Sequence, residues 1–164
     1  MMSMSELSRE VVVSMERSTL YDYAGGEAAF VALTAALHER CLEDPMLNHP
    51  FSHDMDPEHL ERLAEYLAEV FGGPPAYSAL GGGHAAMLLI HAGTGADDEL
   101  PNRFVTCFDL AMDDANLPRD AEFRRVLHEY MVWAVDDVHS YSPIGSVVPT
   151  HATFPHWSWD GLQT

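Results

Sequence analysis

Apolar residues recur at intervals of three and four along most of the chain, a pattern that indicates amphipathic helices. The clearest case runs from about residue 27 to 43, where one side carries Phe30, Thr34, Leu37, His38 and Cys41. Alternating strand patterns joined by tight hairpin turns are nearly absent. The pattern therefore predicts an all-α fold.

Start and stop signals place the other helices. Asp56-Pro57 pairs a capping residue with a proline in the first helical turn, and Gly72-Gly73-Pro74-Pro75 stops the helix that begins there. One face of this helix carries His59, Leu63, Tyr66 or Leu67, and Val70. Two further amphipathic helices are predicted at about 98–115 and 119–139.

The ends of the chain differ from this helical body. We expect an N-terminal helical extension over residues 1–19, with its helix at 5–17, and a turn from Tyr21 to Gly26 around the Gly25-Gly26 pair. Residues 140–164 are rich in proline and aromatic residues and have no helical periodicity, so they predict an irregular tail. Trp157 and Trp159 would be poorly solvated if left free, which favours a tail that packs on the domain or on a partner. The domain itself is then residues 20–139.

Charge and composition exclude several function classes. The sequence has 26 acidic residues against eight basic ones, all arginine, for a formal charge of −18. Such a field repels phosphate backbones and anionic lipid surfaces, so we expect no nucleic-acid partner. No apolar run is long enough to span a membrane and no secretory signal precedes the domain, which predicts a cytoplasmic protein. Cys41 and Cys107 suit free buried thiols.

Three histidines stand out among the ten. His38, His59 and His91 each fall on the apolar side of a different predicted helix, and His91 follows the apolar run from Met87 to Ile90. A buried imidazole without a partner costs roughly 1–3 kcal/mol, so several in one core favour a metal or a prosthetic group between them. The alternative for any one of them is a core histidine bonded to a backbone carbonyl. The short apolar segment before His91 suits contact with a large apolar ligand such as a haem.

An ordered set of motifs resembles the group II truncated haemoglobins, over roughly residues 20–139. These motifs are Leu20-Tyr21-Asp22 with Gly25-Gly26, Phe30, Glu43-Asp44-Pro45, Leu47, Phe51, Gly72-Gly73-Pro74 with Tyr77-Ser78, and His84 ahead of His91. The resemblance implies a globin with a two-over-two helical sandwich around haem b. It also implies that His91 is the proximal iron ligand.

The same resemblance assigns the other site residues. Phe51 would pack on the porphyrin face, and Met87 would also contact the cofactor. The distal ligand pocket would be formed by His38, His59, Leu63, Tyr66 and Phe104. Arg62 matches the position that binds a propionate, and Tyr77 and His84 would be further contacts at the rim.

Three positions depart from the family pattern. The family usually has tyrosine at the position of His38, tryptophan at that of Phe104, and often a basic residue at that of Ile90. The first two changes remove hydrogen-bond donors from the pocket, but His38 and His59 bring imidazoles there. Either could donate to a bound ligand, relay a proton or bind the iron as a sixth ligand.

Four hypotheses of function follow. The first is reversible binding of a diatomic gas, namely oxygen, carbon monoxide or nitric oxide. The second is a haem-dependent enzyme, peroxidase-like or active in nitric oxide detoxification, in which His38 or His59 acts as general acid and base. The third is a globin fold that has lost haem and serves as an interaction module, and the fourth is a zinc site of His38, His59 and His91. Candidate partners are a gas or a peroxide, a reductase, and a second copy of the chain.

Overall fold

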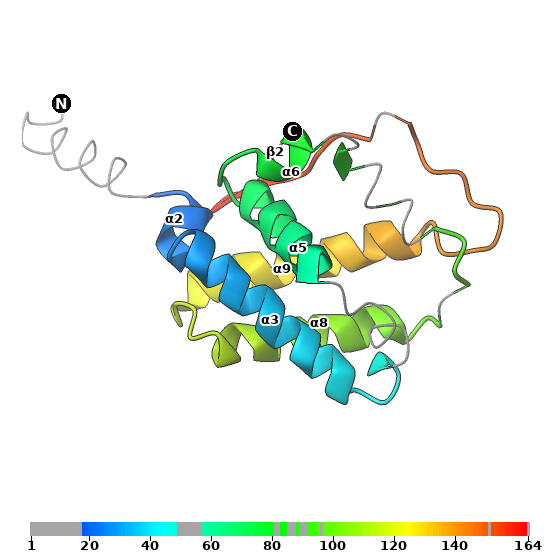
Figure 1. The fold of residues 1–164 in the computed structure, drawn as a ribbon, viewed down its shortest axis with the longest axis horizontal. Coiled ribbons are helices and arrows are strands. Elements are labelled where there is room, and N and C mark those ends of the chain that lie inside the picture. The colour runs from blue at the N-terminus through cyan, green and yellow to red at the C-terminus, as the bar shows by residue number, and fades with distance from the viewer. Residues whose placement is uncertain are drawn as a thin grey trace, which may run out of the picture.

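The computed structural model describes residues 18–48, 57–80, 83–84, 88, 92–95, 97–150 and 152–163. Within them, the body of the molecule consists of four long helices (Figure 1). These are α3 (Glu27–Glu43), α5 (Pro57–Val70), α8 (Leu100–Asp114) and α9 (Ala121–His139). All four match the predicted helices to within two residues at each end. The expected helix at 5–17 and the cap at Asp56 lie outside the described residues.

Helices α3 and α5 run antiparallel. Phe30, in the first turn of α3, stacks on Phe71, which directly follows α5, with ring centroids 5.9 Å apart. The start of α3 therefore lies beside the end of α5. It follows that the C-terminal part of α3, with His38, lies toward the N-terminal part of α5, with His59 and Leu63.

Helices α8 and α9 form the second antiparallel pair. Three polar side-chain contacts follow their seam, at 2.9 Å between His139 and Asp98, 2.9 Å between His128 and Asp109, and 2.8 Å between Arg124 and Asp113. Residues nearer the N-terminus of α9 contact residues nearer the C-terminus of α8, so the two helices run in opposite directions. The two pairs of helices give the predicted two-over-two sandwich.

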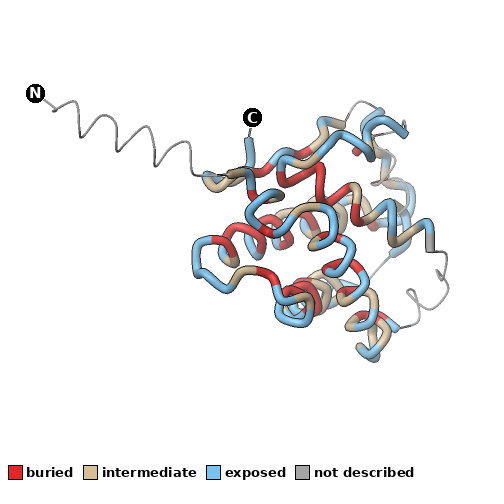
Figure 2. Tube along the Cα trace, turned by 60° about the vertical axis from the view of Figure 1, so that its left-hand side comes forward, coloured by how far each residue is buried: buried red, intermediate tan, exposed pale blue. Residues whose placement is uncertain are grey.

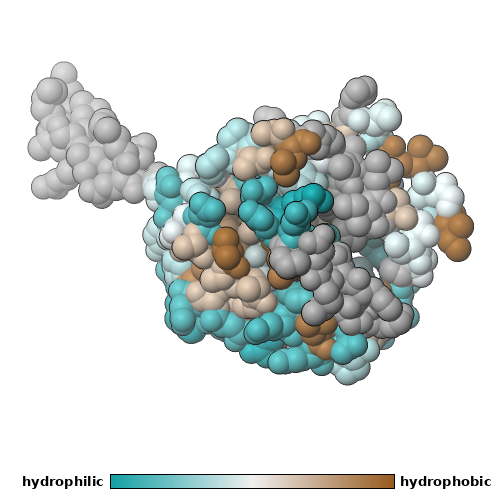
Figure 3. Space-filling view, viewed as in Figure 1, coloured by the Kyte–Doolittle hydropathy of each residue, from teal (hydrophilic) through white to brown (hydrophobic). Residues whose placement is uncertain are grey.

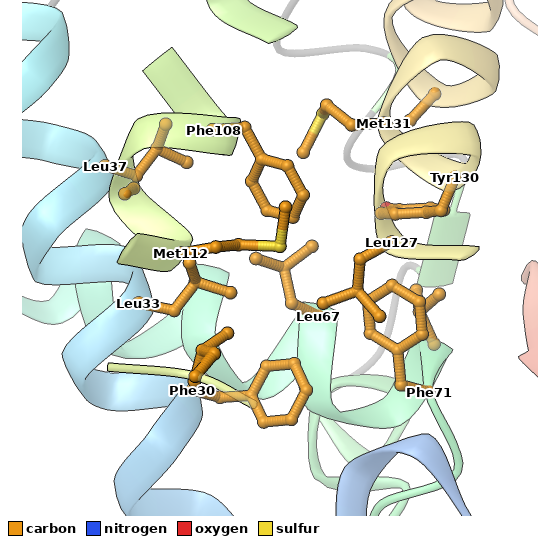
Figure 4. Close-up of a cluster of buried hydrophobic side chains, with 14 of the residues drawn as sticks. Phe30, Leu33, Leu37, Leu67, Phe71, Phe108, Met112, Leu127, Tyr130 and Met131 are labelled. Atoms are coloured by element: carbon orange, nitrogen blue, oxygen red, sulfur yellow. The ribbon is translucent and has the colours of Figure 1, made fainter. Parts of the chain in front are cut away.

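The core fills the space between the two pairs of helices. Figure 2 shows the buried residues gathered on the inward sides of the helices. In Figure 4, Leu33 and Leu37 of α3 face Phe108 and Met112 of α8, and α9 contributes Leu127 and Tyr130 from the opposite side. The residues with no exposed surface include Leu33, Phe71, Phe108, Phe123, Val126 and Leu127. Burial of about 25 cal/mol per Å² of apolar surface makes this cluster the main source of stability.

Short elements absent from the sequence-based prediction frame this body. Residues Leu20–Ala24 form helix α2, where a turn was expected, and the Thr19 hydroxyl caps it by accepting from the Asp22 N–H at 3.1 Å. The one-turn helix α6 (Ala76–Ala79) follows α5. The buried carboxylate of Glu69 holds α6 in place, because it accepts hydrogen bonds from both the backbone N–H and the hydroxyl of Ser78.

The C-terminal tail packs on the domain, as predicted, but part of it is regular. Strands β1 (His156–Ser158) and β2 (Gly161–Gln163) pair as an antiparallel hairpin. Trp157 is buried against Tyr130 and Trp133, and the indole N–H of Trp159 donates to the carbonyl of Ser18 at 2.8 Å. The hairpin therefore joins the end of the chain to the start of the domain.

An exposed apolar loop and two buried free cysteines are further features of the fold. The loop between α9 and β1 carries Ile144 and Val147, which are 87% and 85% exposed. Figure 3 shows apolar (brown) surface at the right-hand edge of the molecule. Cys41 and Cys107 are free and buried, as predicted. Among the described helices, none combines the length and the apolar character needed to span a lipid bilayer.

Candidate functional site

The predicted distal residues lie at one end of the sandwich. His59 and Leu63 are one helical turn apart on α5, and both are half-buried. Leu63 packs against the core cluster one turn before the buried Leu67. Because α3 and α5 are antiparallel, His38 of α3 belongs to the same end of the molecule. The structure thus brings His38 and His59 into one region from two different helices.

Helix α8 adds Phe104 to this region. The thiols of Cys41 on α3 and Cys107 on α8 are free and buried, and each affects the pKa of the other, which places them close together where the two helices cross. His38 lies about one turn before Cys41, and Phe104 one turn before Cys107. Phe104 is half-buried against the core. Half-buried apolar side chains beside imidazoles form a surface suited to a large, mostly apolar ligand.

Three predicted residues lie outside the described part of the chain. They are Phe51, Met87 and His91. Their roles as porphyrin contact, cofactor contact and proximal ligand therefore stay predictions.

Arg62 and Tyr77 lie at the edge of this region. The Arg62 side chain is 60% exposed and pairs with Glu58, at 3.5 Å one turn earlier. An exposed pair at this distance contributes little to stability, so the guanidinium can exchange Glu58 for another carboxylate at low cost. Tyr77 is half-buried and lies edge-on against Tyr66, with ring centroids 5.0 Å apart.

His84 lies in the interior, where a rim position was predicted. Only 5% of its side chain is exposed, and both ring nitrogens contact protein groups. Nδ1 is 2.8 Å from the hydroxyl of Tyr66, and Nε2 is 3.0 Å from Oδ2 of Asp137. A contact with a propionate would require His84 to give up one of these partners.

Sequence analysis missed Asp137, the residue that completes this arrangement. It lies on α9 seven residues after Tyr130, which is two turns along the same helical face. Tyr130 and Ala134 on that face are buried. The sequence did contain a signal for it, namely an acidic residue on a helical face that is otherwise buried. Acidic residues in such positions usually have a partner.

Burial dominates the chemistry of the two tyrosines in this cluster. It raises the pKa of Tyr66 far above its ordinary value, and the nearby Tyr130, Tyr77 and Asp137 add to the effect. Burial also raises the pKa of Tyr130. Both phenols therefore stay protonated throughout the ordinary pH range.

Comparison with known proteins agrees with this architecture. Residues 19–139 match the family model described as bacterial-like globin. A curated relative, the group 1 truncated hemoglobin GlbN of Nostoc commune, is 34% identical over 76 residues, which cover 46% of this chain and 60% of the relative. The aligned part therefore spans less than two thirds of that relative.

Solved structures extend the comparison over nearly whole chains. The thermostable hemoglobin of Thermobifida fusca is 33% identical with a TM-score of 0.61, and the match covers 74% of this chain and 96% of that one. The group II 2-on-2 hemoglobin of Agrobacterium tumefaciens is 25% identical with a TM-score of 0.64, covering 75% and 95%.

The family match extends over most of the chain, and the arrangement of α3, α5, α8 and α9 is that of the solved relatives. The chain belongs to the bacterial-like globin family. The predicted resemblance to the group II truncated haemoglobins and the predicted truncated-globin fold are both confirmed.

Proposed function

We propose that this globin binds haem b, that His91 is the proximal iron ligand, and that the ferrous iron binds a diatomic gas. The observation that supports the proposal is the placement of half-buried His38 and His59 on two antiparallel helices, together with Leu63 and Phe104, which pack half-buried against the core. Residues 20–139 would form the haem-binding domain, with residues 1–19 and 140–164 as additions to it.

The described residues fit a haem. A porphyrin needs apolar walls, polar groups at its rim for the propionates, and an imidazole for the iron. Leu63, Tyr66 and Phe104 supply apolar surface on α5 and α8, and Arg62 supplies an exposed guanidinium close by. The haem itself would supply an iron that binds small ligands in the ferrous state.

The side chains around that iron would set how a gas enters and how long it stays. Leu63 and Phe104 would restrict access, and an imidazole N–H of His38 or His59 would donate a hydrogen bond to a polar ligand. Either imidazole is also a candidate sixth ligand in the absence of gas. Arg62 would orient the ring through one propionate, because a guanidinium matches a carboxylate at two points.

A haem-dependent redox reaction is the second candidate. It rests on the same two imidazoles, because a distal histidine can transfer a proton during cleavage of an O–O bond in a peroxide. This activity would need an external electron donor, such as a reductase.

Spectra of the full-length protein in the ferric, ferrous and carbonyl states test the proposal. We expect a strong Soret band that shifts when carbon monoxide is added to the ferrous form. A protein without that band after incubation with haem would contradict the proposal and favour a domain that has lost haem. Stoichiometric zinc in such a protein, lost in His38→Ala, would instead favour the three-histidine zinc site of His38, His59 and His91.

A further inference from the structure

The cluster of Tyr66, His84 and Asp137 is a chain of hydrogen bonds that reaches from the surface into the core. The Asp137 side chain is 29% exposed, whereas His84 is 5% and Tyr66 3% exposed. Asp137 belongs to α9, His84 to the segment 83–84 and Tyr66 to α5, so only the tertiary fold brings the three residues together. Sequence analysis gave Tyr66 and His84 only contact roles.

The partners of His84 determine where its proton lies. An ionised Asp137 can only accept a hydrogen bond, so Nε2 of His84, at 3.0 Å, carries the hydrogen of a neutral ring. Nδ1 of that ring then has a free lone pair, and it accepts the hydrogen bond from the Tyr66 hydroxyl at 2.8 Å. The phenol of Tyr66 is therefore bonded to a base that is itself oriented by a carboxylate.

We propose that Tyr66 is a redox-active tyrosine that gives one electron to the haem after a peroxide has oxidised it, while its phenolic proton passes to His84. The O–H bond of Tyr66 breaks as a new N–H bond forms at Nδ1. The products are a neutral tyrosyl radical and an imidazolium paired with Asp137, and the electron goes to the oxidised haem. This inference rests on the proposed haem binding.

Two properties of the cluster favour this chemistry. Burial keeps Tyr66 protonated, so its proton leaves only when the electron does, and it needs an acceptor at that moment. The carboxylate of Asp137 stabilises the positive charge that forms on His84.

The surroundings also suit transfer of an electron. Tyr66 lies on α5 on the same side as His59 and Leu63, which we assign to the haem pocket. The rings of Tyr77 and Phe154 lie 5.0 Å from its centroid, and this packing limits the access of solvent to the radical. Tyr23 offers a contrast, because its hydroxyl donates at 2.9 Å to the exposed carboxylate of Asp120, a weaker base than imidazole.

The first test uses electron paramagnetic resonance on ferric, haem-loaded protein frozen shortly after mixing with hydrogen peroxide. We expect a tyrosyl signal in the unmodified chain and in the control Tyr23→Phe, and its loss in Tyr66→Phe. An undiminished signal in Tyr66→Phe, or no tyrosyl signal in the unmodified haem-loaded chain, would overturn the assignment.

The second test does not depend on haem. The full chain as purified is oxidised by photogenerated ruthenium(III) tris-bipyridine, and formation of the tyrosyl radical is followed by transient absorption. His84→Gln removes the base, so it should slow formation of the tyrosyl radical by roughly 100-fold, which is the lower end of the range of general-base effects. The rate of radical formation in the control Asp136→Asn should equal that of the unmodified chain. The rate in Asp137→Asn should fall between those of the unmodified chain and His84→Gln.

The two tests separate this proposal from haem binding itself. A chain that binds no haem but shows the His84→Gln effect would refute the proposed function and retain the proton-coupled chemistry of Tyr66. A chain that binds haem and shows no effect of His84→Gln would refute the redox tyrosine alone.

Discussion

The guanidinium of Arg40 makes two hydrogen bonds to the carboxylate of Asp114, from Nε to Oδ2 at 2.6 Å and from Nη2 to Oδ1 at 2.8 Å. This pair joins α3 to the end of α8, on the opposite side of the helix crossing from the ion pair between Arg103 and Asp44. The hydrogen bond from Arg40 lowers the pKa of Asp114 below its ordinary value of 3.8. The pair therefore makes stability depend on pH.

Asp114→Asn tests this dependence. Because the pKa of Asp114 is lower in the folded chain than in the unfolded one, its stabilising effect is complete above about pH 4 and is lost as the pH falls through the folded pKa. We expect Asp114→Asn to unfold at lower urea concentration than the unmodified chain at pH 7, with a difference that shrinks below pH 4. A difference that stayed constant from pH 7 to pH 3 would contradict this account.

Arg124 and Arg125 are neighbours that should differ sharply in importance. Arg124 donates to the carbonyls of Pro118 at 2.7 Å and Leu117 at 3.1 Å, and so holds the loop between α8 and α9. Among the described residues, Arg125 pairs with Glu129, one turn away on the exposed face. We expect Arg124→Ala to lower the free energy of unfolding by about 2 kcal/mol. Arg125→Ala, measured by urea denaturation in parallel, should cost about 0.5 kcal/mol or less. Equal losses would count against this assignment of the loop contacts.

Gly73 is required by a close approach of the chain to Tyr21. A Cβ at this position would lie 2.7 Å from the carbonyl oxygen of Ala68 and 2.8 Å from Cδ2 of the Tyr21 ring. Gly73→Ala should therefore destabilise the chain by about 1–3 kcal/mol, the usual cost of overpacking. Gly93→Ala is the comparison, because its Cβ meets nothing within 4 Å and its φ of +69° alone should cost about 1 kcal/mol. Thermal unfolding of both variants decides whether the clash at Gly73 is real.

The helices were predictable because their signals are local. The expected span 27–43 is the span of α3, and Gly72 and Gly73 mark the end of α5 as predicted. The hairpin at residues 156–163 was missed because strands of three residues are too short to show alternation.

The candidate site was only partly predictable, for a different reason. His59 and Leu63 follow from helical periodicity, and their roles from the family resemblance. The contact between His84 and Asp137, 53 residues apart, depends on how α9 packs on the rest of the chain. The family resemblance therefore named His84 but gave neither its depth nor its partners.

The two distal histidines should affect how long a gas stays bound. If His38 or His59 donates a hydrogen bond to bound oxygen, its replacement by alanine should speed oxygen dissociation by about tenfold, the effect of a bond worth about 1.4 kcal/mol. His128→Ala is a matched control, because His128 lies on the exposed face of α9 and pairs with Asp109. Stopped-flow measurement of oxygen dissociation in the three variants makes the comparison. Unchanged rates in both distal variants would show that neither imidazole contacts the gas.

Titration of the purified chain with haem, followed through the Soret band, tests the central claim most directly. We expect stoichiometric binding by the unmodified chain and by His128→Ala, and its loss in His91→Ala, because only His91 is assigned to the proximal side of the iron. Full haem binding with an unaltered spectrum in His91→Ala would contradict that assignment and the account of function built on it.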